Sequence, residues 1–144
     1  MINVNSVMNS LYTTISSNST LVNSDVKTCM NDVFNTDGNM TPWVGVYFNG
    51  VTIDPHRIGS STPWRATYDI RIFAQDMSFD NAQDANDKLD RLMWPLMSAV
   101  NSNKNLDGTV HILTNLAVEP FGRNLDDEQW LFTNEIILNY ITDV

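Results

Sequence analysis

The sequence has few of the residues from which small catalytic and metal centres are built. Among its 144 residues there is one cysteine, Cys29, and there are two histidines. A single cysteine excludes an internal disulfide and any cysteine-rich metal site. Cys29 shares one face of a helix predicted over residues 25–34 with Val26 and Val33, so we interpret it as a small buried residue rather than a reactive thiol.

Basic residues are scarce, and long apolar runs are absent. The sequence has eight lysines and arginines and 17 acids, which gives a net charge of −9. The basic residues are scattered along the chain. Such a surface repels a phosphate backbone, so sequence-specific nucleic-acid binding is disfavoured. The apolar runs are too short for a membrane span, and the N-terminus lacks the basic and apolar regions of a signal peptide. We therefore expect a protein that is neither exported nor bound to a membrane.

Motifs of known catalytic chemistry are missing as well. The sequence has no Gly-rich phosphate loop, no nucleophile elbow and no paired metal-ligand histidines. His111 lies in a predicted strand without an acid at ligand spacing. The run Asp54–Arg57 could set the general base His56 beside a carboxylate, but it reads more simply as a turn. We expect no enzyme, no metal site and no cofactor.

Acidic residues at positions 80, 84 and 87 stand at helical spacing. Calcium loops instead need oxygen ligands at alternate positions with a glycine between them. Asp84 precedes Lys88 by four residues, which is the favourable order for an ion pair on a helix surface. We therefore interpret these acids as a solvated helix face.

Two stretches show the periodicity of amphipathic helices. Residues 3–17 carry apolar side chains at helical spacing, with Asn3 or Asn5 available as the N-cap. From about Asp80 to Val100 the apolar residues form one narrow stripe, and Asp80 with Gln83 would make a capping box.

Strand patterns fill most of the remaining chain. Residues 43–48 are rich in β-formers and are followed by Asn49-Gly50, a strong hairpin signal, so residues 51–53 are predicted to return as a second strand. Residues 54–63 read as a loop, and residues 64–75 alternate strictly between apolar and polar. Further alternation predicts strands over 109–118 and 128–142, separated by a loop over 119–124.

These elements predict one α+β domain over residues 1–144. The sheet would be mostly antiparallel, with an N-terminal helix and a long helix packed on one face, in the order α(α)βββαββ. Of the four tryptophans, Trp43, Trp64 and Trp130 begin predicted strands and are expected in the core. Trp94 instead widens the apolar stripe of the long helix beside Met97 and Phe79. This composition is typical of a subunit interface, although the edge of a core beneath a loop would explain it equally well.

The order of the elements resembles the phage tail-terminator family, whose members act in tail completion and head-tail joining. The likeness rests on the Pro-led strand 42–47 (PWVGVY), the alternating strand 65–72 (RATYDIRI) and the acidic-faced helix 81–96 (NAQDANDKLDRLMWPL). It is a pattern of elements that spans nearly the whole chain. The run Thr36–Thr41 before the sheet departs from it.

The resemblance implies a virion structural protein that forms a ring, usually of six subunits, at the head-proximal end of the tail. The ring would stop polymerisation of the tail tube, join the tail to the head-side connector and let DNA pass through its lumen. Its partners would be further copies of the chain, the tail-tube protein and the connector or neck protein. The expected interface residues are Asn49, Gly50, Val51, Ile53, Arg57, Ile58, Trp94 and Met97. The acids Asp126, Asp127 and Glu128 would face the DNA channel.

Two other hypotheses come from different functional classes. A ferredoxin-like module that binds a small molecule or regulates another protein would need a concave pocket with a few convergent polar groups. A small hydrolase would have to use Asp54 and His56.

Overall fold

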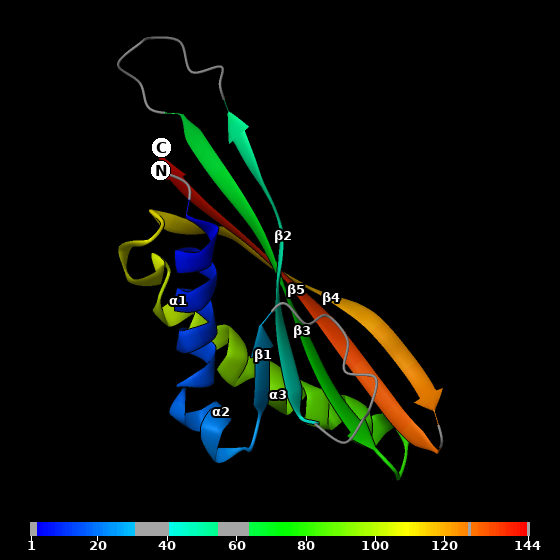
Figure 1. Cartoon of the computed structure of the whole chain (residues 1–144). Coiled ribbons are helices and arrows are strands. Elements are labelled where there is room, and N and C mark those ends of the chain that lie inside the picture. The colour runs from blue at the N-terminus through cyan, green and yellow to red at the C-terminus, as the bar shows by residue number, and fades with distance from the viewer. Residues whose placement is uncertain (1–2, 31–40, 55–63, 127, 144) are drawn as a thin grey trace.

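The computed structural model consists of one twisted five-stranded sheet with its helices on one face (Figure 1). It describes residues 3–30, 41–54, 64–126 and 128–143. The strands lie in the order β1-β2-β3-β5-β4, and all neighbouring pairs are antiparallel except β1 with β2. The predicted α+β class, antiparallel majority and element order are confirmed.

Among the described residues, two helices come before three strands, and a third helix comes before the last two strands. The helices are α1 (Val4–Ser16), α2 (Ser19–Asn23) and α3 (Ala82–Ser102), followed by a single 3₁₀ turn η1 (Leu106–Gly108). The strands are β1 (Lys27–Met30), β2 (Trp43–Asp54), β3 (Arg65–Ser78), β4 (Ile112–Asp126) and β5 (Gln129–Asp143).

Both long helices begin at an asparagine cap. The Asn3 side chain accepts a hydrogen bond from the Ser6 N–H at the start of α1, as one of the two predicted caps. At α3 the cap is Asn81, whose Oδ1 accepts from the Asp84 N–H at 2.8 Å. The predicted capping box at Asp80 is therefore wrong by one residue, because Asp and Asn are equally good caps and the sequence offers both in succession.

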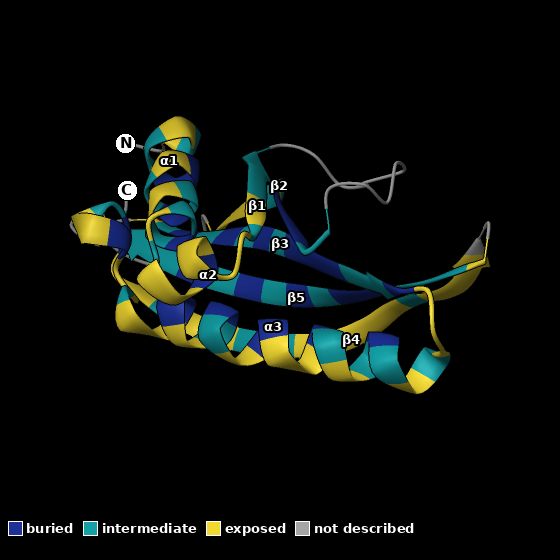
Figure 2. Cartoon of the chain, turned by 90° about the horizontal axis from the view of Figure 1, so that it is seen from below, coloured by how far each residue is buried: buried dark blue, intermediate teal, exposed yellow. Residues whose placement is uncertain are grey.

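The core lies between the helix layer and one face of the sheet. Helix α3 packs on β3 and β5, and α1 packs on β1 and β2. Figure 2 shows α3 turning its buried residues toward the sheet and its exposed residues away from it. Alternate residues of β3 supply the sheet side of this core, as the period-two pattern predicts, and they are Ala66, Tyr68, Ile70, Ile72 and Ala74.

The region after α1 differs from the prediction of a second helix over 25–34. Asn18 caps the short helix α2, and Lys27–Met30 form the edge strand β1, parallel to β2. Cys29 therefore lies half-buried in a strand, opposite Gly45. A four-residue strand is too short for its periodicity to be distinguished from that of a helix.

The predicted hairpin at Asn49-Gly50 is also wrong. β2 continues through these residues to Asp54, and its register against β3 shifts between Phe48 and Gly50, as at a β-bulge. Gly50 takes a φ of +149°, a conformation that glycine adopts at little cost. β3 is long enough to pair with both halves of β2, so the chain reverses only between Asp54 and Arg65.

The predicted loop over 119–124 is part of β4. This strand pairs with β5 from Ile112 to Asp126, with register shifts between Leu113 and Asn115 and between Pro120 and Gly122. A proline is tolerated there because β4 is an edge strand. The tryptophans also divide differently from the prediction. Trp43 is buried and Trp130 is half-buried against the core, but Trp64 is exposed just before β3.

Candidate functional site

The residues considered for catalysis form no catalytic cluster among those that the structure describes. His111 is exposed just before β4, with Nδ1 3.8 Å from Asp143 Oδ2. His56 lies outside the described residues. Within the described ranges, no three His, Cys, Asp or Glu side chains gather as they would to hold a metal ion. The absence of enzymatic activity stays a prediction.

The acidic face of α3 contains a local network of hydrogen bonds and one ion pair. The Ser78 hydroxyl donates to Asp84 Oδ2 at 2.5 Å, and Lys88 Nζ lies 3.4 Å from the same oxygen. The hydrogen bond from Ser78, together with the attraction of Lys88, holds the pKa of Asp84 below its usual value. Gln83 donates to Asp87 one turn further along the helix. These contacts fit the predicted solvated face.

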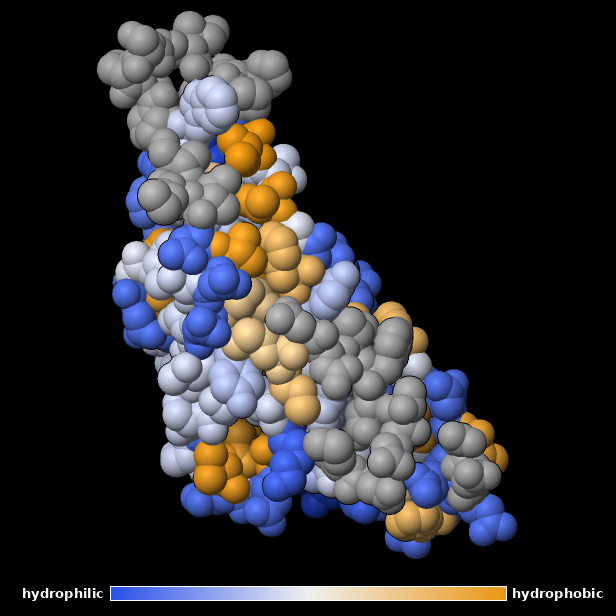
Figure 3. Space-filling model, in the orientation of Figure 1, coloured by the Kyte–Doolittle hydropathy of each residue, from blue (hydrophilic) through white to orange (hydrophobic). Residues whose placement is uncertain are grey.

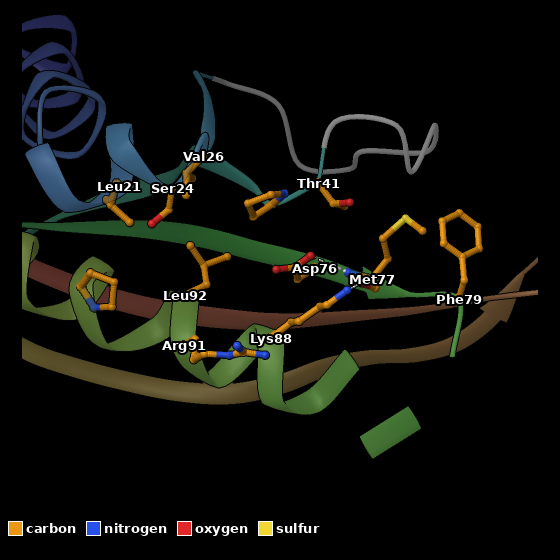
Figure 4. Close-up of a pocket in the computed structure, with 12 residues that line it drawn as sticks. Leu21, Ser24, Val26, Thr41, Asp76, Met77, Phe79, Lys88, Arg91 and Leu92 are labelled. Carbon is orange, nitrogen blue, oxygen red and sulfur yellow. Dashed lines mark hydrogen bonds between the residues drawn. The ribbon is translucent and has the colours of Figure 1, made fainter. Parts of the chain in front are cut away.

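An open pocket of about 630 Å³ lies between α2, the residues just before β1 and β2, and α3, beside the end of β3 (Figure 4). Its volume falls in the range of small-molecule sites, roughly 300 to 1,000 Å³. The apolar lining consists of Leu21, Val26, Pro42, Met77, Phe79, Leu92 and Pro95. The polar lining consists of Ser24, Thr41, Asp76, Lys88 and Arg91.

Asp76 is a half-buried acidic residue in the lining of this pocket. Its Oδ1 accepts a hydrogen bond from the Met77 N–H at 2.8 Å. Burial raises the pKa of the Asp76 carboxyl, although this hydrogen bond and the nearby Lys88 and Arg91 oppose the rise. Lys88 also donates to the Met77 carbonyl and pairs with Asp84. The pocket thus combines apolar walls with one half-buried acid and two cations.

The face of the sheet away from the helices carries a charged network around Arg71. Its guanidinium binds Asp69 at 2.8 and 3.0 Å and Glu135 at 3.1 Å. The hydrogen bond from Arg71 lowers the pKa of Asp69. Asn49, a predicted interface residue, donates to Asp69 Oδ2 at 2.9 Å. Asn49 is therefore held by the neighbouring strand and is exposed on β2.

The predicted interface residues of β2 lie along a free strand edge. β1 pairs with β2 only from Trp43 to Val46, so among the described residues β2 has a neighbouring strand on one side alone from Tyr47 to Ile53. Val51 is half-buried and Ile53 is 37% exposed. In Figure 3, hydrophobic side chains follow the course that β2 takes in Figure 1. Arg57 and Ile58 lie outside the described residues.

The predicted helix surface lies elsewhere on the molecule. Trp94 is 75% exposed and Phe79 is 68% exposed, while Met97 is half-buried against the core. The described part of the chain does not bury Trp94, so it does not pack as a core edge. A role for this flank in an interface stays a prediction.

Of the acids expected at a channel, Asp126 and Glu128 are described, and they lie where β4 ends and β5 begins. Asp126 ends β4 opposite Gln129, and Glu128 is exposed with a φ of +65°. Asp127 lies outside the described residues. Figures 1 and 2 show this turn projecting at the far end of the sheet from the tip of β2 and β3. The direction in which these acids face within an assembly stays a prediction.

Sequence analysis missed both the pocket and the apolar edge of β4. Exposed apolar residues along β4 are Ile112, Val118, Phe121 and Leu125. Pro120 and Gly122 concealed the continuity of this strand, although the apolar residues on either side of them were a usable signal. The pocket joins residues of α2, β3 and α3 with residues of the segments between elements, and no local sequence pattern predicts that these residues meet.

Comparisons with known proteins give a loose similarity of fold. No known protein family and no curated protein matches the sequence. A chain of a solved structure described as "Virion of native gene transfer agent (GTA) particle" aligns over 95% of this chain and 94% of that chain, at 9% identity and a TM-score of 0.43. None of the helices within the described residues is long and apolar enough to cross a membrane. The similarity concerns the path of the backbone alone.

Proposed function

We propose that the chain is a non-enzymatic structural protein of a phage virion, which assembles as a ring at the head-proximal end of the tail. The ring, of six subunits by the resemblance in element order, ends the tail tube, joins it to the head-side connector or neck protein and lets DNA pass. The observation that carries the proposal is the combination, within the described residues, of a single sheet, free edges on both sides and exposed apolar side chains along them. Such edges are normally blunted in monomeric proteins.

Exposed apolar surface on this scale fits assembly better than catalysis. Large exposed side chains occur on β2, on β4 and on α3, at Ile53, Val118, Leu125 and Trp94 among others. Surfaces of this kind mark contacts between proteins. The acidic balance fits a lumen that DNA passes without adhering to it, because like charges repel.

Tail-tube polymerisation tests the role directly. Purified tail-tube protein from a phage that encodes this chain would be allowed to polymerise with and without the chain. We expect tubes of shorter mean length that carry a cap at one end, because the ring would occupy the growing face. Tubes of unchanged length, together with no binding of the chain to tube protein, would contradict the proposal.

The pocket favours a second candidate function, the binding of a small molecule. A ligand that binds only the folded chain would raise its melting temperature, by an amount set by its concentration relative to Kd. A panel of metabolites screened by thermal shift tests this alternative, with Lys88→Met as the matched variant. A shift that depends on Lys88 would support it, and a flat response across the panel would count against it.

A further inference from the structure

The free edges on the two sides of the sheet have a common composition. The β2 edge, defined as Tyr47–Ile53, has the sequence YFNGVTI and contains no charged residue. The β4 edge, defined as Thr114–Val118, has the sequence TNLAV and contains none either. In a chain with 17 acids and 8 bases, both edges lack the charges that usually protect exposed strands.

Both edges are bounded by segments that could not accept another strand. β1 occupies the outer side of β2 as far as Val46. On β4, the Leu113 N–H already donates to the Lys104 carbonyl at 2.8 Å, so the free part begins after Leu113. Beyond Val118, β4 carries Glu119, Pro120 and a register shift, which are devices that block strand pairing.

The sheet register shows that some residues of the β2 edge and of the β4 edge lie on the same line across the sheet, perpendicular to the strands. Phe48 lies opposite Ile70, Ile70 opposite Leu138, and Leu138 opposite Leu116. The next row of this kind runs from Gly50 through Asp69 and Asn139 to Asn115. The two edges therefore overlap in their position along the strand direction, on opposite sides of one sheet. The β2 edge extends further toward the tip of β2 and β3.

The strand directions also suit each other. Three successive antiparallel pairings separate β2 from β4, so these two strands run in opposite directions. A copy rotated about a ring axis keeps its strand directions, so its β4 would meet β2 of the first copy in the antiparallel sense. The offset between the edges supplies a stagger, which a closed ring of tilted strands requires.

We infer that copies of this chain join head to tail by strand addition, with the β4 edge of one copy pairing antiparallel with the β2 edge of the next. The inference rests on the proposed ring and names the contact that builds it. Such a contact is heterologous, and it forms a closed ring with neither edge free when the rotation between successive copies closes, as the proposed ring requires. Main-chain hydrogen bonds would hold the junction, and Ile53 and Val118 would be covered in it.

Two lysine substitutions test the junction by blocking one edge each. Thr52→Lys changes the β2 edge, and Val118→Lys changes the β4 edge, both at exposed positions. Asn9→Lys, on the exposed face of α1, adds the same charge away from both edges and is the matched control. The full chain and each variant would be followed by mass photometry and sedimentation over a range of concentrations, with circular dichroism to verify folding.

Mixing the variants separates head-to-tail contacts from symmetric ones. Wild type and Asn9→Lys are expected to form rings, while each edge variant alone is expected to self-associate at least tenfold more weakly. An equal mixture of Thr52→Lys and Val118→Lys is expected to form heterodimers that grow no further, because only one intact β2 edge and one intact β4 edge remain per pair. Either variant forming rings or homodimers by itself at the concentrations at which wild type forms rings would overturn the inference.

Amide hydrogen exchange gives a second measurement that needs no substitution. In the wild-type assembly, backbone N–H groups within 47–53 and 114–118 are expected to exchange more slowly than in the diluted monomer. Rings without this protection, or rings that the edge variants also form, would overturn the strand junction and leave the ring function standing. A wild-type chain that stays monomeric and does not bind tube protein would overturn both.

Discussion

Two buried tyrosines on neighbouring strands differ in what their hydroxyl groups contact. Tyr68 and Tyr140 lie opposite each other on β3 and β5, and both are almost fully buried. Tyr68 has a hydrogen bond with the backbone of Asn3, whereas the Tyr140 hydroxyl has no partner among the described residues. Burial raises the pKa of both groups. Comparing the two tyrosines therefore shows how a buried hydroxyl changes the free energy of unfolding when it is hydrogen-bonded and when it is not.

Removing each hydroxyl should have opposite effects on stability. Tyr68→Phe is expected to lower the free energy of unfolding by about 0.5–1.5 kcal/mol, the usual contribution of one hydrogen bond. Tyr140→Phe is expected to leave it unchanged or to raise it by up to about 2 kcal/mol, because a buried unpaired group is costly. Urea denaturation of both variants checks this, and a larger loss for Tyr140→Phe than for Tyr68→Phe would contradict it.

Asp76 should make the stability of the fold depend on pH in an unusual direction. Its folded-state pKa is raised, chiefly by burial, so folding favours the protonated form. The stabilisation this gives is fully present below the ordinary carboxyl pKa and is lost as the pH rises through the raised value. Asp76→Asn keeps an oxygen acceptor for the Met77 N–H, and is expected to be more stable than wild type at pH 7.

Thermal denaturation at several pH values checks this prediction. The advantage of Asp76→Asn should shrink steadily as the solution is acidified, because the wild-type carboxyl then becomes neutral as well. Asp90→Asn removes the same charge from an exposed position on α3 and serves as the control. An advantage for Asp76→Asn that stayed constant with pH would show that the Asp76 charge is not its cause.

Among the elements, the cap of α3 offers a sharp test of local structure. Asn81→Ala removes the acceptor for the Asp84 N–H and is expected to cost about 1 kcal/mol. Asp80→Ala changes the neighbour that a capping box would use, and is expected to change stability by less than about 0.5 kcal/mol. Chemical denaturation measures both. A greater loss of stability in Asp80→Ala than in Asn81→Ala would show that Asp80, and not Asn81, caps the helix.

The long periodic elements could be predicted from the sequence, and the irregular ones could not. The alternation through Tyr68 and Ile70 on β3 and the apolar stripe of α3 report which faces are buried. β1 is too short to show a period, and its pairing with β2 is a tertiary contact. At Gly50 a turn and a bulge need the same permissive backbone, so the local signal could not distinguish them.

The candidate site was predicted in part, for a related reason. Val51 and Ile53 were predicted to lie in a strand, but in one that returned after a hairpin and not in the continuation of β2, so the free edge beside them was not predicted. Whether a strand has a free edge depends on which other strands pair with it, and this tertiary pairing is not visible in a local sequence pattern. The exposure of Trp64 and of the β4 side chains likewise depends on where the helices end, which no local pattern records.

At the scale of the whole molecule, the net charge of −9 sets the expected relation to DNA. An acidic surface without a basic patch repels the phosphate backbone. We expect no retention of duplex DNA by the purified chain at physiological salt, in a gel-shift or fluorescence-anisotropy measurement. Tight binding that weakened steeply with added salt would reveal phosphate contacts and contradict a lumen that DNA slides past.

Assembly is the property on which the account depends most. The fold leaves two uncharged strand edges uncovered and several large apolar side chains exposed, including Trp94 and Leu125. A chain built in this way needs partners to cover those surfaces. Further copies of the chain and the tail-tube protein are the partners that we propose.

Negative-stain electron microscopy of the purified full chain tests this claim most directly. The account predicts closed rings, of six subunits by the resemblance in element order, with a central hole wide enough for duplex DNA. Particles with the mass of a single chain at every concentration, and no rings on purified virions, would contradict it.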